Sequence, residues 1–107
     1  MKQALGMMLT GRRVSAEEGK NLGFVNDIAP AGDALKMAKE WANQILECAP
    51  LSVRASKQAA MEGMNAARLE LAMNAKYDQV SAMRHSADFV EGPLAFSEKR
   101  PPHWKGA

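Results

Sequence analysis

The stretch LTGRRVSAEEGKNLGFVNDIAP, residues 9–30, reads as one compact unit around which the rest of the chain can be arranged. Ser15 and Glu18 have the spacing of a capping box, in which the Ser15 hydroxyl accepts from the amide of Glu18 and the Glu18 carboxylate reaches back. Gly23 stands where a helix end needs a left-handed residue. Residues 24–28 are too short and too rich in β-branched side chains for another helix. The stretch therefore predicts a short capped helix followed by a strand-like run.

The rest of the sequence predicts a mainly α-helical chain. Apolar residues recur at intervals of three and four, which places one apolar stripe on each predicted helix. The predicted helices cover residues 1–9, ending at Thr10-Gly11; residues 33–46, with Asp33 as N-cap and Pro50 closing the segment; a segment from Ser52 to Gly63 and Asn65; residues 66–85; and Pro93 through Lys99, after a short helical turn capped by Ser86.

Composition bounds the class of protein. A chain of 107 residues with 47% hydrophobic residues can bury a modest core and is a single domain at most. The net charge of +2 and the interspersed charges argue against nucleic acid or an anionic membrane as a partner. No export signal or membrane span is evident, so a cytoplasmic protein is expected. Few large aromatic residues and eight methionines predict a thin core that a partner subunit or another domain completes.

A second motif lies near the end of the sequence, and together the two motifs resemble the crotonase family of enoyl-CoA hydratases and isomerases. The second has the form EGxxAFxEKRxPxWxG and runs from Glu91 to Gly106. The first comprises Leu9-Thr10-Gly11, Ala16-Glu17-Glu18 and Leu22-Gly23-Phe24-Val25-Asn26 with a proline after it. The resemblance implies that residues 1–107 form the C-terminal helical domain of such a protein, with a first part over residues 1–30, a helical region over 31–107, and no β-rich spiral core.

The same resemblance implies a binding role for two residues of the second motif. In the family the C-terminal helices pack around a trimer axis, and the last helix reaches the coenzyme A site. The aromatic residue of the motif touches the adenine and the lysine meets the 3′-phosphate, which places these roles on Phe96 and Lys99. It also implies a homo-oligomer, a trimer or a dimer of trimers, that takes acyl-CoA without a prosthetic group.

The residues themselves leave two interpretations of this pair. Phe96 and Lys99 are three apart, so on a helix they share one face and offer an apolar plate beside a point charge, to which Arg100 could add. Phe96 could equally be a core residue, and Lys99 and Arg100 could simply interact favourably with the helix dipole at a helix C-terminus.

No catalytic or metal-ligating residue is predicted. Glu17 and Glu18 diverge on a surface helix, and neither His85 nor His103 belongs to a ligand cluster or a nucleophile–base pair. Cys48, on a helical pattern, is expected to be a buried apolar residue. Two hypotheses follow: a C-terminal part of an acyl-CoA hydratase or isomerase, or a stand-alone helical homo-oligomerisation module without activity. Binding of nucleic acid by the basic tail is a third and weaker hypothesis.

Overall fold

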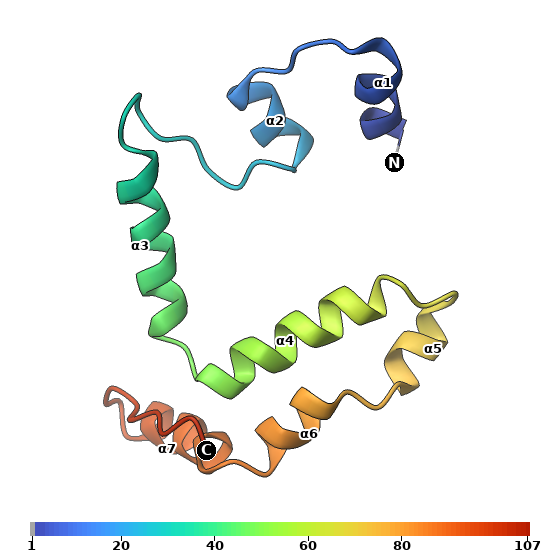
Figure 1. Cartoon of the computed structure of the whole chain (residues 1–107). Coiled ribbons are helices and arrows are strands. Elements are labelled where there is room, and N and C mark those ends of the chain that lie inside the picture. Colours follow the sequence, from blue (N-terminus) through green and yellow to red (C-terminus); the bar gives the residue numbers. More distant parts are fainter. Residues whose placement is uncertain (1) are drawn as a thin grey trace. The chain divides into compact units, whose positions relative to one another are not determined.

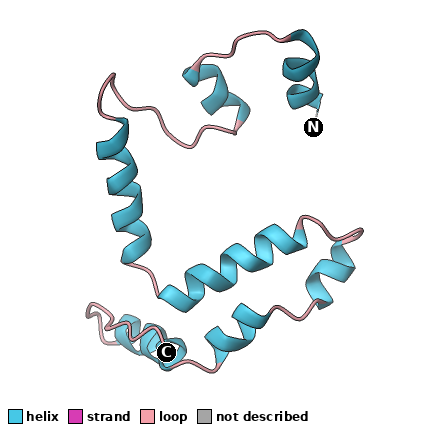
Figure 2. Cartoon of the chain, in the orientation of Figure 1, coloured by secondary structure: helices cyan, strands magenta, loops and turns pink. Residues whose placement is uncertain are grey.

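The computed structural model describes residues 2–107, and the regular structure in this range is helical (Figures 1 and 2). The helices are α1 (Lys2–Thr10), α2 (Ala16–Leu22), α3 (Ala34–Leu46), α4 (Pro50–Gly63), α5 (Leu69–Asn74), α6 (Asp78–Arg84) and α7 (Ala87–Ser97). The predicted mainly α class is confirmed. The contacts divide the chain into two compact units, Met1–Trp41 and Ala42–Ala107, and α3 spans the division. No helix of residues 2–107 combines the length and the apolar character needed to cross a bilayer.

The start and the cap of α2 follow the prediction in part. The Ser15 hydroxyl accepts from the amide of Glu18 at 3.1 Å, as expected. The Glu18 carboxylate does not return to Ser15; it accepts from both terminal nitrogens of Arg12 at 2.6 and 3.1 Å. A guanidinium is a stronger partner for a carboxylate than a neutral amide, which explains the choice. Gly23 ends the helix with φ +84, as predicted.

The strand-like run expected over residues 25–28 is a loop. The amides of Phe24 and Val25 both donate to the carbonyl of Gly19, at 3.1 and 3.2 Å, which ties the loop back to α2. A strand needs a second strand beside it, and residues 2–107 contain none. A turn follows, in which the amide of Asp33 donates to the carbonyl of Pro30 at 3.0 Å before α3 begins.

In the second unit, α4 begins earlier than predicted. Pro50 does not close the preceding helix, which already ends at Leu46; it occupies the first position of α4, with Ala49 as N-cap. Proline is favoured there because its missing N–H would have no helical partner. The predicted end of this helix at Gly63 is confirmed. Cys48, in the connection, is exposed rather than buried.

The single helix predicted over residues 66–85 is broken into α5 and α6, with Ala75 and Tyr77 in extended conformation between them. The break lets α6 lie alongside α4 (Figure 1). The amide of Gln79 donates to Oε1 of Gln58 in α4 at 2.8 Å, and the Tyr77 hydroxyl donates to the carbonyl of Ala72 at 2.8 Å. Side chains thus satisfy backbone groups that the uninterrupted helix would have paired.

Helix α7 is continuous where a restart at Pro93 was predicted. Ser86 caps it, accepting from the amide of Phe89 at 3.2 Å, and Pro93 lies inside it. The cost is the one hydrogen bond that Pro93 cannot donate. The helix ends at Ser97, so Lys99 lies beyond it and not in its last turn.

The predicted thin core is confirmed. Among residues 2–107 the buried apolar residues are three alanines, Ala49, Ala55 and Ala95. Many large apolar side chains are exposed, and those more than three-quarters exposed are Met8, Leu9, Leu46, Met64, Leu69, Met73 and Phe96.

Candidate functional site

Contrary to the sequence prediction, Phe96 and Lys99 do not share one helix face, because the helix ends between them. Phe96 lies in the last turn of α7 with 87% of its surface exposed. Lys99 is also exposed but follows the helix end, with φ +55. Helical periodicity therefore does not relate them. Phe96 is also not part of the core that residues 2–107 form.

A helix-ending motif fixes the backbone of Lys99. The amide of Lys99 donates to the carbonyl of Phe96 at 3.2 Å, and the amide of Arg100 donates to the carbonyl of Ala95 at 3.1 Å. These two bonds define a Schellman motif, whose left-handed position is usually a glycine. Among residues 2–107, Lys99 is the one non-glycine residue with positive φ. A side chain in this region costs roughly 1–2 kcal/mol, so the surroundings must hold it there.

Arg100, the residue after Lys99, is held by two carboxylates. Its Nη1 and Nη2 donate to the two carboxylate oxygens of Glu91 at 2.6 and 3.1 Å, and its Nε donates to Glu98 at 2.6 Å. Glu91 also accepts from the amide of His103 at 2.7 Å. Donation by Arg100, and then by this amide, lowers the pKa of Glu91 to about 2. The same carboxylates raise the pKa of Arg100, which is therefore not the free cation that the sequence suggested beside Lys99.

Asp88 anchors the last residues of the chain. It is only 4% exposed, and its two carboxylate oxygens accept from the amides of Lys105 and Gly106 at 2.7 and 2.9 Å. The amide of Ala87 donates to the carbonyl of Ala107 at 2.8 Å. The tail after α7 therefore folds back along the first turns of the same helix, as Figure 1 shows.

Trp104 completes this arrangement. Its Nε1 donates to the carbonyl of Glu47 at 2.8 Å, where α3 has just ended. Its ring lies against Gly92, where an added Cβ would stand 3.4 Å from the indole. An added Cβ at position 92 would therefore make an ordinary van der Waals contact with the tryptophan ring. In the sequence these residues are only letters of the second motif, and their spacing is the one signal there of a structural unit.

The second motif therefore divides into two groups of residues. Those that build the fold and its tail are Glu91, Gly92, Ala95, Arg100, Trp104 and Gly106. Phe96 and Lys99 are the exposed residues of the motif that join neither group of contacts, and the Lys99 ammonium takes part in no hydrogen bond or ion pair found among residues 2–107. An exposed aromatic plate near an unpaired cation can bind a planar ring that carries an anionic group.

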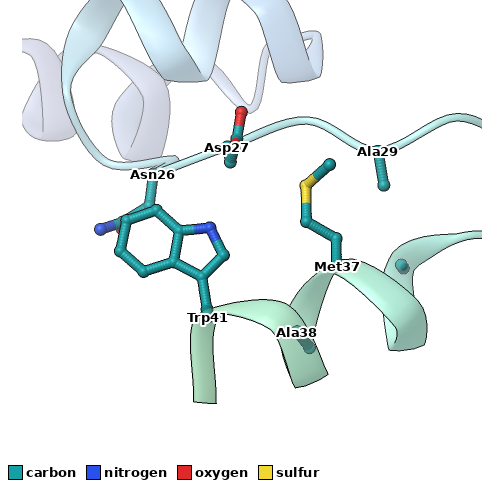
Figure 3. Close-up of a pocket in the computed structure, with 7 residues that line it drawn as sticks. Asn26, Asp27, Ala29, Met37, Ala38 and Trp41 are labelled. Atoms are coloured by element: carbon teal, nitrogen blue, oxygen red, sulfur yellow. The ribbon is translucent and has the colours of Figure 1, made fainter. Parts of the chain in front are cut away.

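A hollow of about 320 Å³ in the first unit is a second place to consider (Figure 3). Trp41 and Met37 from α3 face the loop that carries Asn26, Asp27 and Ala29. The Asp27 carboxylate already accepts from Lys20 at 2.7 Å and from the amide of Ile28 at 2.9 Å. Donation by Lys20 is the main reason why the pKa of Asp27 is lowered. Asp27, the one acidic residue among the described residues that line this hollow, is thus engaged through its Oδ1 atom.

The histidines remain apart. His85 Nδ1 lies 2.7 Å from the carbonyl of Ser81, and the amide of His103 belongs to the tail contact with Glu91. Within residues 2–107, no group of three or more His, Cys, Asp or Glu side chains is placed to hold a metal ion.

Comparison with known proteins gives a consistent family. The sequence matches the family described as enoyl-CoA hydratase/isomerase over residues 1–107. The carnitinyl-CoA dehydratase of Salmonella arizonae is 39% identical over 106 residues, covering 94% of this chain and 40% of the relative. The carnitinyl-CoA dehydratase of Proteus mirabilis is 38% identical over 108 residues, with the same two shares.

Solved structures agree with this match. An enoyl-CoA hydratase/isomerase from Mycobacterium paratuberculosis has a TM-score of 0.90 at 32% identity, covering 100% of this chain and 42% of that one. An enoyl-CoA hydratase from Bacillus anthracis has a TM-score of 0.88 at 33% identity, covering 100% and 41%. The chain thus spans about two fifths of the length of the relatives it matches.

Proposed function

Since this chain belongs to the enoyl-CoA hydratase/isomerase family, we propose that it is the C-terminal part of an enzyme that adds water to, or shifts, a double bond conjugated to an acyl-CoA thioester. Removal of water, which the names of the carnitinyl-CoA dehydratases describe, is the same reaction run backwards. Residues 1–107 would form one helical domain that supplies subunit contacts and part of the coenzyme A pocket. The catalytic groups are assigned to the rest of the enzyme.

The observation that carries the proposal is the division of the second motif. Its structural residues are engaged in the tail, whereas Phe96 is 87% exposed and Lys99 is exposed in a left-handed conformation that a glycine would adopt more easily. A lysine with a strained backbone, three residues after an exposed aromatic ring, is expected where the binding of a ligand compensates for the free energy of that strain. The adenine of coenzyme A would stack on Phe96, and its 3′-phosphate would meet Lys99.

Variants of the natural gene product that carries this sequence test the proposal. Stacking of a base on an aromatic ring is worth roughly 1–3 kcal/mol by alanine substitution, so Phe96→Ala should raise the apparent KM for acyl-CoA about tenfold with little change in kcat. Lys99→Ala should raise it about threefold to fivefold, because an exposed ion pair contributes less.

Matched controls lie in the same region. Phe89 is a second exposed phenylalanine of α7, 51% exposed, and Lys105 is a second exposed lysine of the tail. Phe89→Ala and Lys105→Ala should leave the KM for acyl-CoA unchanged. If Phe96→Ala and Lys99→Ala also leave it unchanged, the nucleotide role is removed.

A helical homo-oligomerisation module without activity is the second candidate, and the exposed apolar side chains favour it. Intact-mass measurement of the protein from its native cell separates the two. A mass well above 11.6 kDa, with this sequence at the C-terminus, supports the enzyme. A mass of about 11.6 kDa together with a stable oligomer in sedimentation and no affinity for coenzyme A supports the module.

A further inference from the structure

We propose that Arg100 is a positioning residue, which fixes Lys99 for contact with the anionic group of the nucleotide through its ion pair with Glu91. The inference rests on the function proposed above. It assigns to Arg100 no contact with the ligand. Its effect is to hold the backbone of the preceding residue in the conformation from which the Lys99 ammonium is presented.

The geometry around Lys99 supports this role. Arg100 is held by its main chain, through the bond to the carbonyl of Ala95 at 3.1 Å, and by its side chain, through the two bonds to Glu91 at 2.6 and 3.1 Å. Both contacts fix the residue that directly follows Lys99. A lysine at φ +55 is disfavoured intrinsically, so a conformation of this kind persists only where its neighbours are fixed.

The guanidinium itself is occupied on all three nitrogens. Nε donates to Glu98, Nη2 donates to Glu91, and Nη1 donates to Glu91 and to the carbonyl of Pro101 at 3.2 Å. One guanidinium between two carboxylates leaves a net charge of −1. A phosphate would therefore find its attraction at Lys99, whose side chain is exposed and joins no ion pair among residues 2–107.

Glu91 binds the chain at a second point after Arg100. Its Oε1 atom, which accepts from Arg100, also accepts from the amide of His103 at 2.7 Å. The chain is thus tied to α7 on both sides of the turn that follows Lys99. Loss of the bidentate pair should free the Schellman turn to sample other conformations while the helix itself remains.

The experiment compares the affinities for coenzyme A and for 3′-dephospho-coenzyme A, measured by calorimetry on the natural gene product. The ratio of the two affinities reports recognition of the 3′-phosphate, which a purely structural loss would not change selectively. Lys99→Ala should lower the ratio about fivefold. Arg100→Lys keeps the charge but loses the bidentate fork, and it should lower the ratio about threefold. Glu91→Gln should have a similar effect.

The double variant Lys99→Ala with Arg100→Lys decides how Arg100 acts. If Arg100 acts through Lys99, the double variant should lose no more than Lys99→Ala alone. A loss equal to the product of the two single effects would mean that Arg100 itself contacts the phosphate, and it would overturn the inference.

The chain offers a matched control in its first unit. Arg12 and Glu18 form a bidentate pair with the same two distances, 2.6 and 3.1 Å. Arg12→Lys should leave the ratio unchanged. If Arg100→Lys fails to fold, Glu91→Gln carries the test. An unchanged ratio in Lys99→Ala refutes the proposed function. A lowered ratio in Lys99→Ala, with Arg100→Lys and Glu91→Gln at the level of the control, overturns this inference alone.

Discussion

Replacing Asp88 by alanine should release the C-terminal tail. The substitution removes two hydrogen bonds from backbone amides to a carboxylate that is 4% exposed. Each such bond contributes roughly 1.5–3 kcal/mol. Because Lys105 and Gly106 are themselves exposed and their amides can regain water, the sum should lie near the lower end. We expect Asp88→Ala to lower the free energy of unfolding by about 2–4 kcal/mol, a large part of an ordinary domain's stability.

Asp78→Ala is the matched control. Asp78 and Asp88 each lie in the first turn of a helix, α6 and α7, but Asp78 is exposed whereas Asp88 is buried. It measures the helix-dipole contribution, about 0.3–1 kcal/mol, without the tail. Asp88→Asn keeps one acceptor oxygen and should lie between the two.

Urea unfolding gives the difference in stability, and amide hydrogen exchange locates it. The amides of Lys105 and Gly106 should lose their protection in Asp88→Ala and keep it in Asp78→Ala. If both variants cost the same and the two tail amides exchange equally slowly, the carboxylate does not hold the tail and the reasoning is refuted.

Three other outcomes follow from single residues. Because the pKa of Glu91 is about 2 in the folded state against roughly 4.3 in an unfolded chain, the unfolded state binds more protons between these values. The stability contributed by Glu91 should be complete above about pH 4.3 and disappear as the pH falls toward 2, and acid titration of Glu91→Gln should lack this loss. Lys99→Gly relieves the positive φ and should raise the free energy of unfolding by about 0.5–1 kcal/mol in urea, while lowering the affinity for coenzyme A. Gly19→Ala should fail to give the stabilisation of about 1 kcal/mol that helix propensity predicts, because its Cβ would stand 2.7 Å from Val25 and 3.0 Å from Phe24; a full gain in thermal stability would contradict the contact.

Local signals in the sequence were sufficient for the helix caps. The Ser15 and Ser86 caps and the glycine end at Gly23 involve partners within a few residues, so their chemistry can be read from spacing alone. The predicted return of Glu18 was wrong because Arg12, outside the capping box, competes for the carboxylate.

The predicted helix boundaries were wrong at two places, and at the first of them a contact with a distant part of the chain explains the difference. Residues 66–85 have continuous helical periodicity, yet the helix breaks because α6 packs on α4 and Gln58 takes a backbone amide of the next helix. Pro93 was predicted to restart a helix, but the helix that begins after Ser86 runs through it.

The candidate site likewise combines residues that the sequence indicated with contacts that it did not. Phe96 and Lys99 were identified from a resemblance, and their roles remain proposals. The contacts that hold the tail after α7 were not predicted, because their partners are separated by long stretches of chain: Asp88 and Lys105 by 17 residues, and Trp104 and Glu47 by 57. No periodic pattern links residues at such distances.

The sequence by itself determined the helical class, the capped helix ends and the family. The class and the caps depend on the spacing of nearby residues, and the family is indicated by motifs that can be recognised in the sequence. Only the tertiary structure decided that Lys99 lies outside α7 in a left-handed turn and that Arg100 is engaged by Glu91. It also decided that the motif's tryptophan binds the end of α3. The physical reason is that the conformation of a side chain depends on the groups that folding brings into contact with it. Those groups can lie far away in the sequence, so the spacing of residues along the chain does not identify them.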